Sequence, residues 1–237
     1  MVVGIDRLWL PIASLGTCLA LAFFGAELLL ELPASVDEAE AQGLAHEAGL
    51  TLRTIAQAQS RFAADGVVDV DNDGLGEFGF LRELGGDLVR GAAGRPRASL
   101  IDSDLGALVT NTRGHRTALA GHYVFQVWLP GRGGVPTADT TSIERAGVGA
   151  IDTDQAEQRW CAYAWPATEV TARQPAFYVG ADGTLWKTDW SLGPHYLGVD
   201  AGPDAAASSS TGGSVWSGPS GDGHPSRDGR IWHPVFP

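Results

Sequence analysis

The chain has 237 residues, of which 28 are acidic and 16 basic, and its formal net charge is -12 at pH 7. This length allows one domain with appendages, or two small domains. An acidic surface repels phosphates, so the charge excludes nucleic acid as a partner and fits an exported protein that binds cations. The two cysteines, Cys18 and Cys161, lie in different parts of the chain and provide no disulfide framework.

The N-terminal part predicts a membrane anchor. Leu8 to Ala26 carries no charged residue, and its length matches the roughly 20 residues that cross a hydrocarbon core. Arg7 precedes this run and an acidic block follows it, so we expect a cytoplasmic N-terminus and an exported body. Two alternatives remain open. They are cleavage of a signal peptide near Ala39–Ala41 and lipidation of Cys18, which the continuing apolar run disfavours.

Beyond Pro33 the sequence predicts an amphipathic helix from Val36 to Phe62. Apolar residues and one glutamine recur there at three- and four-residue steps, which is typical of one helix face. The residues of this face are Leu44, Ala48, Leu52, Ile55, Gln59 and Phe62. Asp65-Gly66 follows the last of them and predicts the end of the helix.

An acidic run from Val67 to Glu77 comes next. A short helix is predicted near Phe80–Leu84, before Gly85-Gly86. Leu88 to Ala118 contains many glycines and small residues and predicts an irregular segment.

Strands dominate the following part of the chain. Aromatic and β-branched residues predict four of them, at His122–Leu129, Arg159–Trp165, Ala176–Val179 and Thr184–Thr188. The last two flank Gly180–Gly183, which predicts a hairpin. Gly131 to Asp154 is predicted to be a long polar loop. Together the helix and strands predict an α+β domain in which the helix packs on a small antiparallel sheet.

The C-terminal part has a different composition. Gly, Ser, Ala, Pro and Asp dominate from Ser191 to Arg230, which is typical of a linker. Ile231–Phe236 is apolar and is predicted to dock back on the body.

This layout, with one apolar anchor, a helical extension, a loop and a small sheet, resembles type IV pilins and type II secretion pseudopilins. Five sequence words in the body carry the resemblance in order, from about Leu50 to Trp186. They are Leu52–Gln59 (LRTIAQAQ), Asp71–Gly79 (DNDGLGEFG), Gly121–Phe125 (GHYVF), Ala162–Pro166 (AYAWP) and Phe177–Gly183 (FYVGADG).

The resemblance implies a pilin-like α+β fold, in which a transmembrane helix continues into the amphipathic helix that packs on the sheet. Residues 1–34 would be the anchor, 35–190 the pilin-like domain and 191–237 a Gly/Ser/Pro-rich tail. It also implies a non-catalytic, envelope-anchored structural protein that acts by self-assembly or by contact with other pilin-like or exported proteins. Family members carry a glycine cleavage site that is followed by an apolar run with a glutamate a few residues in. The N-terminus departs from this pattern, because in Gly25–Glu31 the glutamate is displaced by one position and the apolar run precedes the glycine. Ordinary prepilin processing is therefore not expected.

The acidic run contains the sharpest chemical signal. Carboxylates at alternate positions around a glycine suit Ca2+, which binds about six to eight oxygens. A backbone carbonyl joins in related loops, and here it would be that of Leu75. The predicted ligands are Asp69, Asp71, Asp73, Leu75 and Glu77. The loop is not a full EF-hand, because Phe80 stands where an EF-hand has its last glutamate. A solvated acidic turn that binds no ion remains the alternative.

No catalytic constellation is found in the sequence. Gly74–Gly79 matches GxGxxG, but the carboxylates around it would repel a pyrophosphate. The six histidines lack zinc spacing, and no GxSxG elbow is present. We therefore expect no enzyme, and a hydrolase is a distant third possibility. The competing function is an exported calcium-dependent module that binds glycans or surfaces through its tryptophans and the acidic loop.

Overall fold

The structure is a computed structural model that describes residues 13–87, 90, 98–140, 147–189, 196–210, 213–214, 216–219, 221 and 223–236. Of residues 13–37, 147 and 148 only the backbone is described. The chain divides into two compact units, residues 1–40 and 41–237. The predicted span Leu8–Ala26 lies outside the residues whose side chains are described. Among the residues that the structure describes, no helix is long and apolar enough to cross a bilayer.

Helix α1 (Ala13–Ala64) begins in the first unit and ends in the second. In the second unit its buried residues follow the predicted face, on which Leu44 is only partly buried. They are Ala41, Ala45, Ala48, Gly49, Leu52, Ile55, Ala58, Gln59 and Phe62. Gln59 is satisfied by backbone, because its amide donates to the carbonyl of Gly79 at 2.6 Å and accepts from the N–H of Gly79 at 2.8 Å. Gly66, with φ +56°, follows the end of the helix, so the predicted amphipathic helix and its stop are confirmed.

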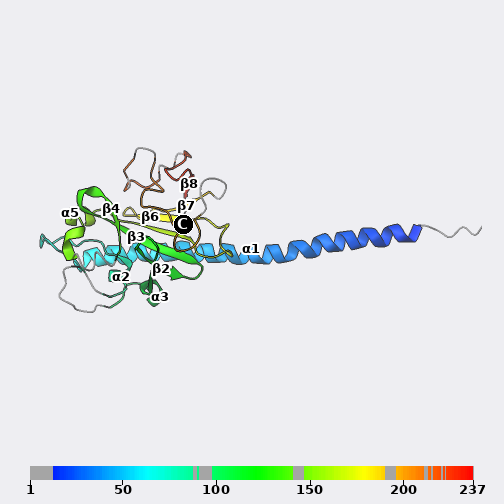
Figure 1. The fold of residues 1–237 in the computed structure, drawn as a ribbon, viewed down its shortest axis with the longest axis horizontal. Coiled ribbons are helices and arrows are strands. Elements are labelled where there is room, and N and C mark those ends of the chain that lie inside the picture. Colours follow the sequence, from blue (N-terminus) through cyan, green and yellow to red (C-terminus); the bar gives the residue numbers. More distant parts are fainter. Residues whose placement is uncertain are drawn as a thin grey trace, which may run out of the picture. The chain divides into compact units, whose positions relative to one another are not determined.

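The strands form one antiparallel sheet (Figure 1). They are β1 (Leu108–Thr110), β2 (Arg116–Ala120), β3 (Tyr123–Pro130), β4 (Pro136–Ala138), β5 (Cys161–Pro166), β6 (Phe177–Gly180), β7 (Leu185–Thr188) and β8 (Trp232–Pro234). The order is β1-β2-β3-β5-β6-β7-β8, and β4 pairs with β3 beside this path. The four predicted strands correspond to β3, β5, β6 and β7, and the predicted hairpin joins β6 to β7. The α+β prediction is therefore confirmed.

Both faces of the central strands β3, β5 and β6 are buried. On one face α1 packs in a core with β-strand residues such as Ala162, Ala164 and Val179. On the other face Tyr163 and Trp165 of β5 belong to a second core. Because side chains alternate along a strand, β5 presents alanines to the helix and large aromatic rings to the opposite side.

Residues of the C-terminal part cover the aromatic face. Ala205 and Ala207 belong to its core, and Ser208 is fully buried. Tyr163 Oη lies 2.9 Å from Ser208 Oγ and donates to the carbonyl of Ala205 at 3.2 Å. The linker interpretation is therefore wrong for these residues, because aromatic rings on the sheet need a cover that small residues can supply. The predicted docking of the apolar end is confirmed, since β8 pairs with β7 and Trp232 is buried.

Short elements fill the segments predicted to be irregular. The predicted short helix is α2 (Leu81–Leu84), and it is followed by α3 (Ser103–Gly106). The predicted polar loop holds β4, the 3-10 helices η1 (Arg132–Gly134) and η2 (Gly147–Ala150), and α5 (Thr153–Ala156). Of these, α5 lies next to the acidic loop and contributes to the candidate site.

Candidate metal site

The acidic loop connects α1 to α2 and is anchored at both ends. Val67 and Val68 are buried before it, and Phe80 is buried after it. The backbone N–H of Glu77 donates to the carbonyl of Val68 at 2.9 Å, which closes the loop at its base. The loop therefore presents its acidic residues from two fixed points.

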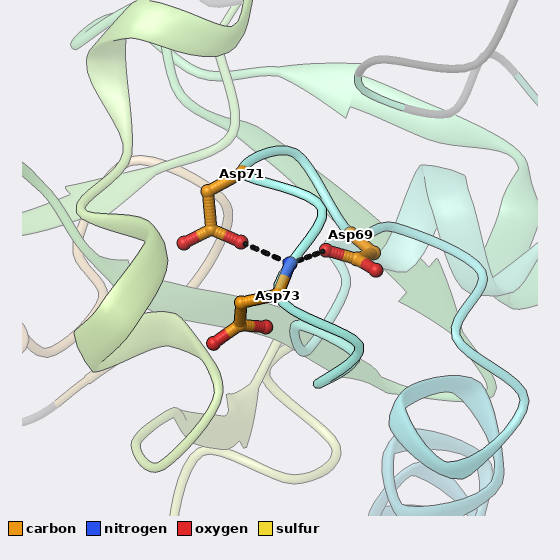
Figure 2. A group of neighbouring side chains, drawn as sticks. All are labelled: Asp69, Asp71 and Asp73. Carbon is orange, nitrogen blue, oxygen red and sulfur yellow. Dashed lines mark hydrogen bonds between the residues drawn. The ribbon is translucent and has the colours of Figure 1, made fainter.

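Three aspartates of this loop converge (Figure 2). Asp69, Asp71 and Asp73 each offer one carboxylate oxygen, and these oxygens lie within 4.8 Å of one another. The backbone N–H of Asp73 donates to Asp69 Oδ1 at 3.2 Å and to Asp71 Oδ1 at 3.4 Å. Each carboxylate has further lone pairs that these bonds do not use. The backbone thus gathers the carboxylates and leaves acceptor capacity for a cation.

The turn between these aspartates depends on two residues with positive φ. Asn72 has φ 61° and Gly74 has φ 90°, a region that Asn and Gly tolerate best. The N–H of Gly74 donates to Asp69 Oδ2 at 3.2 Å, and that of Leu75 donates to Asp73 Oδ1 at 2.8 Å. The side chain of Leu75 is 58% exposed. Ligation by the Leu75 carbonyl stays a prediction.

A second acidic group shares Asp71. Ligand oxygens of Asp71, Asp154 and Glu157 also lie within 4.8 Å of one another. Asp154 belongs to α5 and Glu157 follows its last residue. Two segments that are far apart in the chain therefore bring five carboxylates to one place.

Helix α5 is held against the loop by backbone and ring contacts. The Asp152 carboxylate caps α5 by accepting from the N–H of Gln155 at 3.2 Å. The N–H of Phe78 donates to the carbonyl of Ala156 at 2.8 Å, and the rings of Phe78 and Trp160 lie 6.0 Å apart. These contacts fix Asp154 and Glu157 beside Asp71.

The electrostatics of the site concentrate on Glu157. Burial and the neighbouring carboxylates of Asp73 and Asp71, with a smaller contribution from Asp154, raise the pKa of Glu157 to about 7. Its Oε1 atom is buried and has no hydrogen-bond partner among the described residues. Proton uptake or a bound cation would relieve this repulsion.

Glu77 lies apart from both acidic groups. Its Oε2 atom pairs with Arg90 Nη1 at 3.0 Å, and its Oε1 atom accepts from the N–H of Val70 at 3.1 Å. Arg90 also binds Glu83 through Nε at 2.9 Å. Burial raises the pKa of Glu77, and the charge of Arg90 opposes that rise. The structure thus places this predicted ligand in a buried ion network beneath the loop.

The donor set fits a hard divalent cation. Two oxygens that bind one Ca2+ at about 2.4 Å can lie at most about 4.8 Å apart, and both groups meet this limit. The donors described there are carboxylate oxygens, which suit Ca2+ better than softer metals that prefer nitrogen or sulfur. Asp69, Asp71 and Asp73 would hold such an ion, and Asp154 and Glu157 are candidate additional ligands.

Sequence reasoning missed Asp154 and Glu157. Asp154 ends the predicted polar loop and Glu157 lies between that loop and the strand predicted from Arg159, and no local spacing connects them to the acidic run. The only local signal is the capping pattern that begins at Asp152. No protein-family model matches the chain, and neither a curated protein nor a solved structure is found to match it.

Proposed function

We propose that this chain is a non-catalytic, pilin-like structural protein, anchored in the cell envelope through Leu8–Ala26 with its body outside the cytoplasm. It acts by assembling with copies of itself or with other exported proteins. The observation that carries the proposal is the packing of the C-terminal part of α1 against one face of an antiparallel sheet. The ordered sequence words from about Leu50 to Trp186 support the same reading.

An apolar groove supports contact with another chain. It has a volume of about 380 Å³, and α1 and the strands β6 and β7 line it together with the C-terminal end. Leu50 is 50% exposed and Phe236 is 81% exposed at this groove. Exposed apolar side chains that share one groove are typical of protein interfaces. We propose that a neighbouring subunit covers Leu50 and Phe236 in the assembly.

A calcium ion at the acidic loop would serve this function structurally. It would join the loop after α1 to α5, because Asp71 belongs to both acidic groups. It would also neutralise carboxylates that repel one another without it. We therefore propose a structural role for the ion, with no part in a reaction.

Electron microscopy of the full chain, purified in mild detergent, tests the proposal. We expect ordered fibres in calcium and fewer or none in excess chelator. Leu50→Asp should prevent assembly, because a charge in the interface would lose its hydration. Val170→Asp is the matched control, since Val170 is also 50% exposed but does not line the groove.

Two outcomes would contradict assembly through this groove. The first is a wild-type chain that stays monodisperse at every calcium concentration. The second is a Leu50→Asp variant that assembles as the wild type does. Monodisperse particles that are retained on immobilised glycans only in calcium would favour the competing function, a calcium-dependent binding module.

A further inference from the structure

A second cleft shares no lining residue with the groove of α1. Its volume is about 330 Å³, and it is bounded by the residues after α5, the β6–β7 hairpin and residues 216–219. The residues that matter for its chemistry are Gln158, Arg159, Tyr178, Asp182, Trp186 and Trp216. None of them belongs to either acidic group of the candidate metal site.

Aromatic rings form one part of this cleft. Tyr178 and Trp186 come from neighbouring strands and pair directly across them, and Trp216 comes from the C-terminal part. Tyr178 is buried, whereas Trp186 and Trp216 are only partly buried. Large rings that are accessible at a cleft offer flat apolar surface to a ligand.

Glycines of the C-terminal part hold these rings in place. A Cβ atom on Gly221 would lie 2.9 Å from Trp186 Cη2, and one on Gly218 would lie 3.2 Å from Tyr178 Cε1. Both glycines also have positive φ, at +68° and +66°. A side chain at Gly221 would force Trp186 to shift, and one at Gly218 would be tight against Tyr178, so glycine suits both positions. The C-terminal part thus packs closely on two of the rings that line the cleft.

Polar groups line the same cleft. Gln158, Arg159 and Asp182 are exposed there, and they bring an amide, a guanidinium and a carboxylate. Asp182 Oδ1 accepts from the N–H of Thr184 at 3.1 Å, which fixes the carboxylate in the hairpin turn. The cleft therefore offers polar groups of three kinds to a ligand beside its aromatic rings.

We propose that this cleft binds a neutral oligosaccharide. A sugar ring has an apolar face of C–H groups that packs on an aromatic ring, and hydroxyls at its edge that bind amides, guanidinium groups and carboxylates. Asp182 and the net charge of -12 disfavour an acidic sugar. The proposal goes beyond assembly, because it gives the exposed body a ligand of its own.

Binding of defined oligosaccharides to the full chain tests this inference. The probes are chitotetraose, cellotetraose and maltotetraose, titrated in calcium buffer and followed by tryptophan fluorescence and by calorimetry. We expect at least one of them to bind in the micromolar to millimolar range. Trp186→Ala and Asp182→Asn should each weaken that affinity about tenfold or more.

Matched controls separate binding from folding. Asp204 is also exposed and accepts from the N–H two residues later, at 2.8 Å, but it does not line this cleft, so Asp204→Asn should bind as the wild type does. Because Asp182 is exposed, the Asp182→Asn variant should keep the wild-type melting temperature even if the Trp186→Ala variant does not fold. The inference is overturned if no probe binds the wild type, or if Asp182→Asn keeps full affinity. Because the titration does not depend on fibres, its result is independent of the assembly experiment.

Discussion

Carboxylate oxygens of Asp71 and Glu157 lie within 4.8 Å of each other, although one residue belongs to the loop after α1 and the other follows α5. Asp71 also meets Asp69 and Asp73, so it belongs to both acidic groups. Like charges at this distance destabilise the fold unless a proton or a cation lies between them. Stability of the body should therefore depend on both pH and calcium.

The first prediction concerns pH and Glu157. Its pKa rises from 4.5 to about 7 in the folded protein, so the folded form binds more protons than the unfolded form between these values. Stability from this group is fully present below 4.5 and is lost as the pH rises through about 7. In chelator, Glu157→Gln should melt at a higher temperature than the wild type at about pH 8, and the difference should vanish at about pH 4.

Thermal unfolding at several pH values in excess chelator checks this prediction. Asp104→Asn is a suitable control, because Asp104 is exposed and lies outside both acidic groups. An equal melting temperature of Glu157→Gln and the wild type at every pH would show that Glu157 carries no repulsion.

The second prediction concerns calcium. A ligand that binds only the folded form stabilises it by about 2.7 kcal/mol at a hundredfold excess over Kd. For a body of this size that corresponds to a rise in melting temperature of roughly 5–10 °C. Calcium should produce this rise in the wild type, and Asp71→Ala should abolish it because both acidic groups lose their shared member.

Differential scanning calorimetry in millimolar calcium and in excess chelator measures this effect, with Asp104→Asn again as the control. Identical melting curves in both buffers would mean that Asp69–Asp73 form only a turn. In that case the metal proposal fails, whereas the resemblance in the strand words is untouched.

The helix and four strands could be predicted because their signals are local. Apolar residues of α1 repeat along one face, and the β-branched and aromatic residues of β3 and β5 favour strands wherever they lie. Strands β1, β2, β4 and β8 were missed as strands. They have three to five residues each, and tertiary pairing determines their conformation more than their composition does.

The remaining features could not be predicted because they depend on tertiary contacts. Ser208 and Ala205 belong to a stretch with the composition of a linker, and their packing depends on tertiary contacts such as those with the buried Tyr163. Similarly, Glu77 fits the spacing of a metal ligand, but Arg90 lies close enough to pair with it. A local pattern shows which residues can bind an ion, whereas the fold determines their partners.

The third prediction concerns this ion network. Arg90 is buried and pairs with Glu77 at 3.0 Å and with Glu83 at 2.9 Å. Arg90→Met would leave two buried carboxylates without their cation, so we expect a loss of about 3–5 kcal/mol of unfolding free energy. The exposed pair of Arg61 and Asp65, at 3.7 Å, provides the control. Arg61→Met should cost less than about 1 kcal/mol.

Urea denaturation of the three proteins measures these free energies. If Arg90→Met and Arg61→Met were equally stable, the network beneath the loop would not hold the fold together. Restoring stability by adding Glu77→Gln to Arg90→Met would show that the uncompensated carboxylate causes the loss.

The fourth prediction concerns the cover on the aromatic face of the sheet. A Cβ atom on Gly202 would lie 2.3 Å from Cζ2 of the buried Trp165. Since Trp165 also donates from Nε1 to the carbonyl of Gly198 at 2.8 Å, the ring has little freedom to move away. Gly202→Ala should therefore displace the covering segment and cost about 1–3 kcal/mol. Gly43→Ala, on an exposed helix position with no atom within 4 Å of the added Cβ, should be neutral or stabilising by up to about 1 kcal/mol.

Thermal unfolding and the near-UV circular dichroism of the tryptophans measure both variants. A Gly202→Ala protein with the wild-type melting temperature and spectrum would mean that residues 198–210 do not pack on the sheet in solution, and that the composition of the C-terminal part does describe a linker.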